Sequence, residues 1–257
     1  MSINKLFDLS ARTALVTGAS QGIGKAIALA LAEHGANVII NYRSNSSLAE
    51  ETAELVREYE VKCWLWQFDL ENINVAESYR KFINKNNCNV DILVTNASVQ
   101  IRRPWDLVTS EEFAAQINVN LRSTLTLIQE VVPFMKEKQW GKILNIGSIQ
   151  QIRPHQDMCI YAASKSGLVN LIKNLAVQLA PYGININNLA PGVIATARNE
   201  KVLANTEYQQ ATLQKIPLGY AGQPIDCAPL ALLLCSDAGK YITGGDFFVD
   251  GGMSLFN

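Results

Sequence analysis

The feature that most constrains the fold is a regular alternation of short apolar runs with amphipathic segments. Near-continuous apolar runs are typical of strands that helices cover on both faces. Such runs occupy residues 13–18, 37–42, 63–70, 91–97, 142–148, 184–192 and 246–252. Helical patterns lie at 23–34, 47–59, 75–85, 111–138 and 161–180, and 228–235 suits about two turns of buried helix. The alternation predicts an α/β fold with a doubly wound parallel sheet.

Length and composition favour one domain. The chain has 257 residues, of which 48% are hydrophobic, which is enough to bury one large core. We find no repeat, low-complexity tract or Pro/Gly/Ser-rich linker. We therefore expect a single domain over residues 1–257.

Charge and hydropathy argue against several classes of protein. The net charge is −1, and the largest basic clusters, Arg102–Arg103 and Lys136/Lys138, are too small to follow a nucleic-acid backbone. No apolar stretch approaches the roughly 20 residues of a membrane span, and we see no signal-peptide pattern. The five cysteines and two histidines lack metal-ligand spacing. We expect a cytoplasmic protein with no nucleic-acid, membrane or metal partner.

A glycine-rich loop joins the first strand to the first helix. Gly18, Gly22 and Gly24 have GxxxGxG spacing, with hydroxyl side chains at Thr17 and Ser20. Glycines permit a tight turn and a close approach of the backbone, and the helix N-terminus attracts a pyrophosphate. Although any strand-to-helix turn can use glycine, this context predicts a dinucleotide-binding loop.

The end of the second strand bears on which dinucleotide is bound. A carboxylate there would bind the ribose 2′-hydroxyl of NAD, whereas an arginine accommodates the 2′-phosphate of NADP. This chain has Tyr42 and Arg43, and no acidic residue until Glu50. NADP(H) is therefore favoured and NAD is the alternative, because Arg43 could also be a solvated loop residue and Gln21 stands where a second basic residue would strengthen the case.

Tyr161 and Lys165 share a face at the start of an amphipathic helix, since side chains four apart are neighbours. Reduction of a carbonyl by a nicotinamide requires a proton donor, and the reverse reaction requires a base. An ordinary phenol has a pKa of about 10, so ionisation near pH 7 needs roughly 4 kcal/mol of stabilisation. One cation about 4 Å away supplies a similar energy at an effective dielectric near 20. Ser148, at the end of a strand, could hold the substrate oxygen.

Several motifs together resemble the compact branch of the short-chain dehydrogenase/reductase family. In order, they are TGASQGIG (17–24), NAS (96–98), NVN (118–120), Ser148, YAASK (161–165) and PGVIAT (191–196). The likeness spans almost the whole chain. It implies a three-layer Rossmann fold with about seven strands, an NAD(P)-dependent oxidoreductase and, as is usual in the family, a homotetramer.

The resemblance also implies roles for individual residues. Tyr161 would be the acid or base, and Lys165 would bind the nicotinamide ribose and favour the ionised phenol. Ser148 would orient the substrate, and the backbone of Asn120 would hold a water molecule of a proton relay. The implied cofactor-binding residues are Gly18, Ser20, Gln21, Gly22, Ile23, Gly24, Tyr42, Arg43, Ser44, Asp69, Leu70, Asn96, Ala97, Ser98, Tyr161, Lys165, Pro191, Gly192, Ile194 and Thr196. The chain departs from the usual NNAG motif at Thr95 and Ser98, and Ser98 adds a side chain beside the cofactor.

The segment between Ser148 and Tyr161 faces the substrate in similar proteins, and here it is polar. Gln150 and His155 are candidate substrate contacts, although a surface loop can be polar for solubility alone. Residues 197–215 read as a helical flap that could close over a substrate.

The predicted activity is oxidation or reduction of a small polar alcohol or carbonyl compound such as a sugar or polyol. The chain resembles bacterial glucose dehydrogenases in this respect. It also resembles 3-oxoacyl-carrier-protein reductases, so the alternative reaction is reduction of a 3-oxoacyl thioester. The alternative of another class is a sensor or scaffold that binds NADP(H) without turnover.

Overall fold

The computed structural model describes residues 2–199 and 206–255 and contains a single seven-stranded sheet in that part of the chain. Its strands are β1 (Thr13–Thr17), β2 (Asn37–Tyr42), β3 (Cys63–Gln67), β4 (Ile92–Thr95), β5 (Gly141–Ile146), β6 (Ile184–Pro191) and β7 (Asp246–Val249). All neighbours pair in parallel, in the order β3-β2-β1-β4-β5-β6-β7. The predicted fold class is confirmed. The strand order reverses between β1 and β4, and such a switch point at the carboxyl ends of the strands is where α/β proteins bind ligands.

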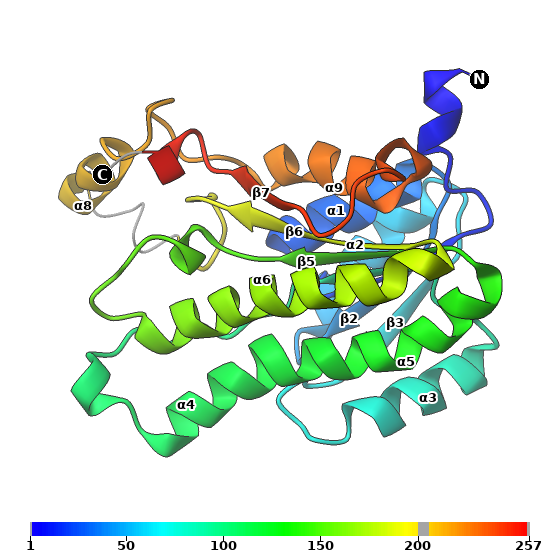
Figure 1. Cartoon of the computed structure of the whole chain (residues 1–257), viewed down its shortest axis with the longest axis horizontal. Helices are drawn as coiled ribbons and strands as arrows, with labels where there is room; N and C mark the ends of the chain where they lie inside the picture. The colour runs from blue at the N-terminus through cyan, green and yellow to red at the C-terminus, as the bar shows by residue number, and fades with distance from the viewer. Residues whose placement is uncertain (1, 200–205, 256–257) are drawn as a thin grey trace.

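Helices cover both faces of the sheet (Figure 1). One layer contains α1 (Gly22–Glu33), α2 (Ser46–Arg57) and α9 (Ala228–Cys235). The other contains α3 (Val75–Asn86), α4 (Ser110–Ile117), α5 (Ser123–Lys138) and α6 (Cys159–Leu179). Short 3₁₀ turns lie at Ile3–Phe7, Trp105–Leu107, Ile149–Gln151, Ala180–Tyr182, Pro224–Cys227, Asp237–Gly239 and Met253–Leu255.

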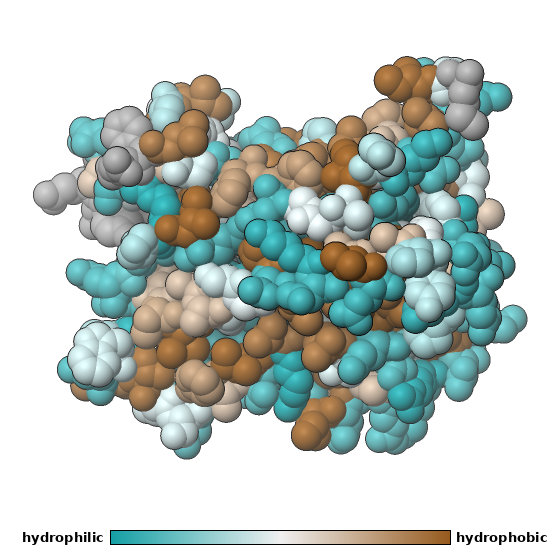
Figure 2. Space-filling model, viewed as in Figure 1, coloured by the Kyte–Doolittle hydropathy of each residue, from teal (hydrophilic) through white to brown (hydrophobic). Residues whose placement is uncertain are grey.

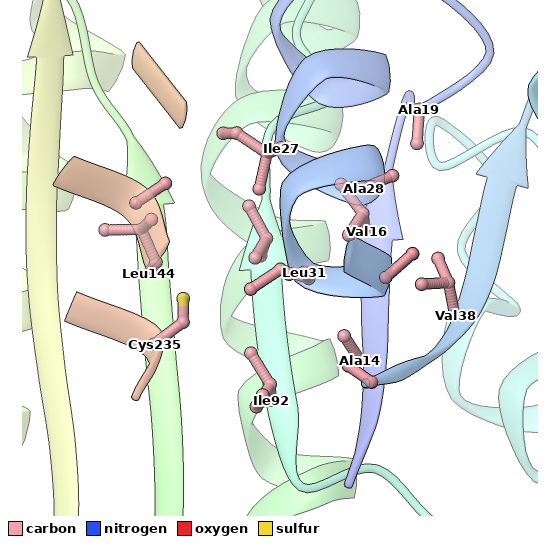
Figure 3. Packing of buried hydrophobic residues seen from close by; sticks show 14 of the residues in the cluster. Ala14, Val16, Ala19, Ile27, Ala28, Leu31, Val38, Ile92, Leu144 and Cys235 are labelled. Atoms are coloured by element: carbon pink, nitrogen blue, oxygen red, sulfur yellow. The ribbon is translucent and has the colours of Figure 1, made fainter. Parts of the chain in front are cut away.

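Successive strand residues enter different layers of the core because side chains alternate across a sheet. Ala14 and Val16 of β1 face the layer that contains Ile27 and Leu31 of α1 (Figure 3). Leu15 points to the opposite side, toward α5 and α6. All five side chains are completely buried, which accounts for the continuous apolar run. Burial of each of the four larger side chains contributes about 1.5–3 kcal/mol relative to exposure.

The amphipathic segment 111–138 is helical, but not as one uniform α-helix. A π-helical turn at Asn118–Arg122 separates α4 from α5. Within it the Ser123 amide donates to the Asn118 carbonyl, five residues earlier. The Asn120 side chain bonds both backbone groups of Val99, which follows β4. Such bulges are frequent at functional sites, and this one joins the helix to a loop at the carboxyl edge of the sheet.

The predicted flap includes α8 (Thr206–Leu213), whereas residues 200–205 lie outside the described residues. A closing motion of the flap, like the assignment of residues 1–257 to one domain, stays a prediction. In the described part of the chain, no helix is long and apolar enough to cross a membrane.

Candidate active site

A cleft of about 900 Å³ opens at the carboxyl ends of the strands, where the loops after β1, β2, β4, β5 and β6 meet. Most of the predicted site residues line it. They are Gly18, Ser20, Gln21, Gly22, Ile23, Tyr42, Arg43, Ser44, Asp69, Leu70, Asn96, Ala97, Ser98, Ser148, Gln150, Tyr161, Lys165, Pro191, Gly192, Ile194 and Thr196. Gly24, Asn120 and His155 do not contribute to its lining.

The glycine loop forms a cradle with little side-chain cover. Gly18 and Gly22 have φ angles of +61° and +60°, in the left-handed region that favours glycine. A Cβ on Gly18 would lie 3.0 Å from the Ala97 Cα, so the backbone approach also requires glycine there. Helix α1 begins at Gly22 with no acidic residue in its first turn. The loop and helix N-terminus therefore fit the pyrophosphate of a dinucleotide.

Gly24 lies outside the cleft lining, and its lack of a side chain allows close packing between the helix and the glycine loop. A Cβ there would be 2.5 Å from the Asn96 Nδ2 and 2.6 Å from the Gly18 carbonyl oxygen. The same Asn96 amide donates to the carbonyl oxygens of Thr17 and Gly18, at 2.9 and 3.1 Å. Asn96 thus braces the glycine loop from the neighbouring strand, in addition to lining the cleft.

The part of the cleft next to the carboxyl end of β2 carries a positive charge. Arg43 is exposed and lines the cleft beside Ser44, while Tyr42 is buried. In residues 2–199 and 206–255, no carboxylate lies within 4.0 Å of the Arg43 guanidinium. Its charge is therefore available to a phosphate, which guanidinium groups bind with two parallel hydrogen bonds.

Tyr161 and Lys165 come together in the first turns of α6, as their spacing predicted. Both are buried, at 4% and 2% exposure, and both line the cleft. The Lys165 Nζ lies 5.7 Å from the centroid of the Tyr161 ring. It donates to the Ile146 carbonyl oxygen at 2.7 Å, which ties α6 to the end of β5.

Lys165 is an unusual lysine because of where its amine lies. Burial first, and the positive charge of Arg198 second, lower the pKa of Lys165 from 10.5 to about 7. No carboxylate in the described segments lies within 4.0 Å of it. An anion that forms beside Lys165 would favour the charged amine.

The turn after β5 carries Ser148, Gln150 and Gln151, and the two glutamine side chains differ in their hydrogen bonds. The Ser148 Oγ accepts from the Gln150 amide at 3.2 Å. Gln151 is held by Asp246 of β7, to whose carboxylate its Nε2 donates at 2.7 and 2.8 Å. Asn188 of β6 also donates to Asp246, at 2.7 Å, and to Gln151. This partly buried network holds the turn that presents Ser148 and Gln150 to the cleft.

Thr95, one of the two departures from the expected motif, extends the same network. Its Oγ1 donates to the Asn145 Oδ1 at 3.0 Å, and the Asn145 amide donates to Asn188. Ser98, the other departure, lines the cleft, and its carbonyl accepts from the Arg198 guanidinium at 2.7 Å. The Thr95 side chain therefore has a partner of its own, whereas the bond at Ser98 is made by its backbone.

Asn120 lies beside the cleft, in the π-helical turn. It is 1% exposed, and its amide donates to the Val99 carbonyl and to the Ser164 Oγ, both at 3.0 Å. Its backbone carbonyl accepts from the Thr124 Oγ1 at 2.9 Å. The side chain is committed to holding the helix against the loop after β4, and a water-binding role of the backbone stays a prediction.

His155 lies outside the cleft lining, in the loop before α6. Its Nδ1 accepts from the Asp157 amide at 3.1 Å. Burial and then the charge of Arg102 lower its pKa. A direct substrate contact for His155 stays a prediction.

Known proteins match this chain over almost its whole length. Residues 18–254 match the family model described as enoyl-(acyl carrier protein) reductase. The 3beta-hydroxysteroid dehydrogenase 1 of Eggerthella lenta is 36% identical over 250 residues, which cover 97% of this chain and 96% of that protein. The chain belongs to the short-chain dehydrogenase/reductase family.

Two solved members of the short-chain dehydrogenase/reductase family illustrate the likeness. A 3-oxoacyl (acyl-carrier-protein) reductase from Agrobacterium tumefaciens with NADP bound has a TM-score of 0.92 at 35% identity, covering 98% of this chain and 97% of that one. A gluconate 5-dehydrogenase from Burkholderia cenocepacia in complex with NADP and tartrate has a TM-score of 0.92 at 32% identity, covering 100% of both chains. This protein is thus an NAD(P)-dependent oxidoreductase that acts on CH–OH groups.

Sequence reasoning missed several residues of the cleft, among them four that follow β4, precede Tyr161 or follow β6. Gln100, Arg102, Met158 and Arg198 all line it, and the Gln100 Nε2 donates to the Met158 sulfur. None carries a local motif. The available signal was position, since Gln100 and Arg102 follow β4, Met158 stands three residues before Tyr161, and Arg198 follows β6 by seven residues.

The buried amine of Lys165 gives a testable dependence of stability on pH. Because its folded pKa is below its unfolded value, the unfolded chain binds the extra proton between about pH 7 and 10. The stability contributed by Lys165 therefore rises with pH across this window and is lost as pH falls to about 7. Relative to Lys165→Met, we expect the free energy of unfolding of the wild type to rise by up to about 1.4 kcal/mol per pH unit.

Urea denaturation of both cofactor-free proteins between pH 7.5 and 9.5 measures this difference. Lys173→Met is the matched control, since Lys173 is exposed on the same helix. Parallel pH dependences for the wild type and Lys165→Met would show that Lys165 keeps its proton in the folded protein.

Proposed function

We propose that this enzyme prefers NADP(H) and interconverts a small polar carbonyl compound and its alcohol, of the sugar or polyol type. The observation that carries the proposal is one cleft lined by the glycine cradle and Arg43 at the ends of β1 and β2, and by Ser148, Tyr161 and Lys165 at the end of β5 and the start of α6. A bound nicotinamide supplies hydride chemistry. The chain supplies the proton and holds the substrate.

The proton donor in this proposal is the Tyr161 hydroxyl. In reduction it protonates the oxygen of the carbonyl as that oxygen gains negative charge, and in oxidation the phenolate removes the alcohol proton. The Lys165 amine, fixed by the Ile146 carbonyl, stabilises the phenolate by its positive charge. Ser148 donates a hydrogen bond to the same substrate oxygen.

The polarity of the cleft supports a polar substrate. Gln100, Arg102, Gln150 and Arg198 line it together with the reacting residues. A pocket for a steroid or a long acyl chain would be predominantly apolar. Similarity to a gluconate 5-dehydrogenase supports the same substrate type.

Reduction of a 3-oxoacyl thioester is the second candidate. It is favoured by the 35% identity to the 3-oxoacyl reductase from Agrobacterium tumefaciens. The 3-oxo carbonyl of such a thioester would take its proton from the same Tyr161 and its hydrogen bond from Ser148.

The central experiment measures oxidation of NADPH with a panel of keto-sugars and with acetoacetyl thioesters. We expect turnover of at least one keto-sugar, and Tyr161→Phe to lower kcat by at least about 100-fold because the proton donor is lost. The dissociation constant of NADPH should stay within a few-fold. Turnover of thioesters alone would favour the second candidate, and an unchanged rate in Tyr161→Phe would contradict the assigned role.

The preference for NADP(H) has its own test at Arg43. Replacing Arg43 by Ala should weaken NADPH binding by about 10- to 100-fold, because a charge-assisted bond to phosphate is lost, and leave NADH binding nearly unchanged. Fluorescence titration of each nucleotide measures both constants. Arg57→Ala is a control, since Arg57 pairs with Glu50 outside the cleft. Equal losses for NADPH and NADH in Arg43→Ala would remove this argument.

We propose a homotetramer, as the family resemblance implies. Hydrophobic residues gather on the surface over α4 and the adjacent parts of α5 and α6 (Figure 2), and Phe113 of α4 is 47% exposed. Such a patch is typical of an interface. Light scattering should give the mass of four 28.3 kDa chains, whereas a monomer mass at micromolar concentration would contradict it.

A further inference from the structure

We propose that the substrate is a small polyhydroxy acid or the keto acid formed from it, whose carboxylate binds Arg102 and one of whose non-reacting hydroxyls donates to the side-chain Oε1 of Gln150. This inference rests on the proposed function and names the substrate class for the same cleft.

Arg102 lies at the substrate end of the cleft, away from Arg43. It belongs to the segment after β4, which is fastened to the approach to α6. There Gln100 donates to the sulfur of Met158, and the Arg103 amide donates to the Asp157 carbonyl at 2.8 Å. Met158 precedes Tyr161 by three residues. A group that binds Arg102 is therefore close to the reacting end of the substrate.

The guanidinium of Arg102 is available, whereas that of its neighbour is not. Arg103 forms a forked ion pair with Glu112 outside the cleft. Arg102 is exposed, lines the cleft and has no carboxylate within 4.0 Å in residues 2–199 and 206–255. The ion pair with Glu112 thus gives Arg103 a structural role, whereas the guanidinium of Arg102 is available to bind a ligand in the cleft.

A second cation, Arg198, lines the same cleft. Arg198 reaches into the cleft to bond the Ser98 carbonyl, and its charge acts on Lys165. The excess of positive charge favours an anionic substrate over a neutral polyol.

Gln150 supplies the second observation. Its Oε1 is buried and accepts no hydrogen bond from any described residue, although Gln150 lines the cleft. A buried acceptor without a donor costs about 1–3 kcal/mol, which a substrate hydroxyl would recover. Because Gln150 follows Ser148 by two residues in a fixed turn, it would select a hydroxyl near the reacting carbon.

The test uses alcohols that differ only at the acid group. D-gluconate is compared with D-glucitol, and D-galactonate with D-galactitol, in the reduction of NADP⁺. We expect kcat/KM for at least one acid to exceed that of its alditol by about 10- to 100-fold, the effect of one charge-assisted arginine contact. Arg102→Gln should raise KM for that acid by the same factor and leave the alditol unchanged.

Two variants refine this result. Arg103→Gln is the matched control and should leave both KM values unchanged. Gln150→Met should lower kcat/KM for the acid by about tenfold, with the NADP⁺ dissociation constant unaltered. Equal kinetics for acid and alditol in the wild type, or equal losses in Arg102→Gln, would overturn the carboxylate contact.

A binding measurement separates this proposal from the proposed function. Calorimetry of each acid with the NADP⁺-loaded Tyr161→Phe protein reports binding without turnover. Acid binding that Arg102→Gln abolishes, with no oxidation of any substrate by the wild type, would retain the carboxylate site and contradict the proposed reaction. Absence of Arg102-dependent binding for both acids would overturn the inference even if keto-sugars are reduced.

Discussion

The hydrogen bond between the Lys165 amine and the Ile146 carbonyl is the contact on which the arrangement of the active site depends. It joins the first turns of α6 to the last residue of β5, at 2.7 Å and away from solvent. Ser148 follows two residues after the end of β5, and Tyr161 precedes Lys165 by about one helical turn. A single bond between a helix and a strand thus brings into one place three side chains that the sequence separates. It does so with an amine whose charge burial disfavours.

The parallel sheet provides the rest of the geometry. Every strand ends at the same edge, so loops that are more than 100 residues apart in the chain line a common cleft. Arg198, after β6, therefore reaches the carbonyl of Ser98, after β4. The π-helical turn has a similar effect, because Asn120 bonds the backbone of Val99 on the loop that continues to Arg102. Contacts of this kind determine where the polar groups of the cleft lie.

Much of the fold could be predicted because its signals are local. A strand buried on both faces requires a continuous apolar run, and all seven such runs became strands. The glycine loop and the Tyr161–Lys165 pair were equally local, since backbone conformation and helical spacing place those residues. The π-helical turn was not visible, because the apolar pattern of 111–138 continues through it. Arg102 and Arg198 were missed as cleft residues for a related reason, since only tertiary contacts distinguish them from solvated arginines such as Arg57.

The two adjacent glutamines after β5 differ in how freely they can be exchanged. Gln151 belongs to a hydrogen-bonded chain that runs from Asp246 through Asn188 and Asn145 to Thr95, across four strands. A new side chain at Gln151 would disturb the sheet edge as a whole. The side-chain oxygen of Gln150 accepts no hydrogen bond from any described residue. Replacing Gln150 would therefore alter the cleft and leave the hydrogen-bonded chain through Gln151 intact. Laboratory evolution of new substrate ranges in this enzyme should therefore accumulate changes at one glutamine and spare the other.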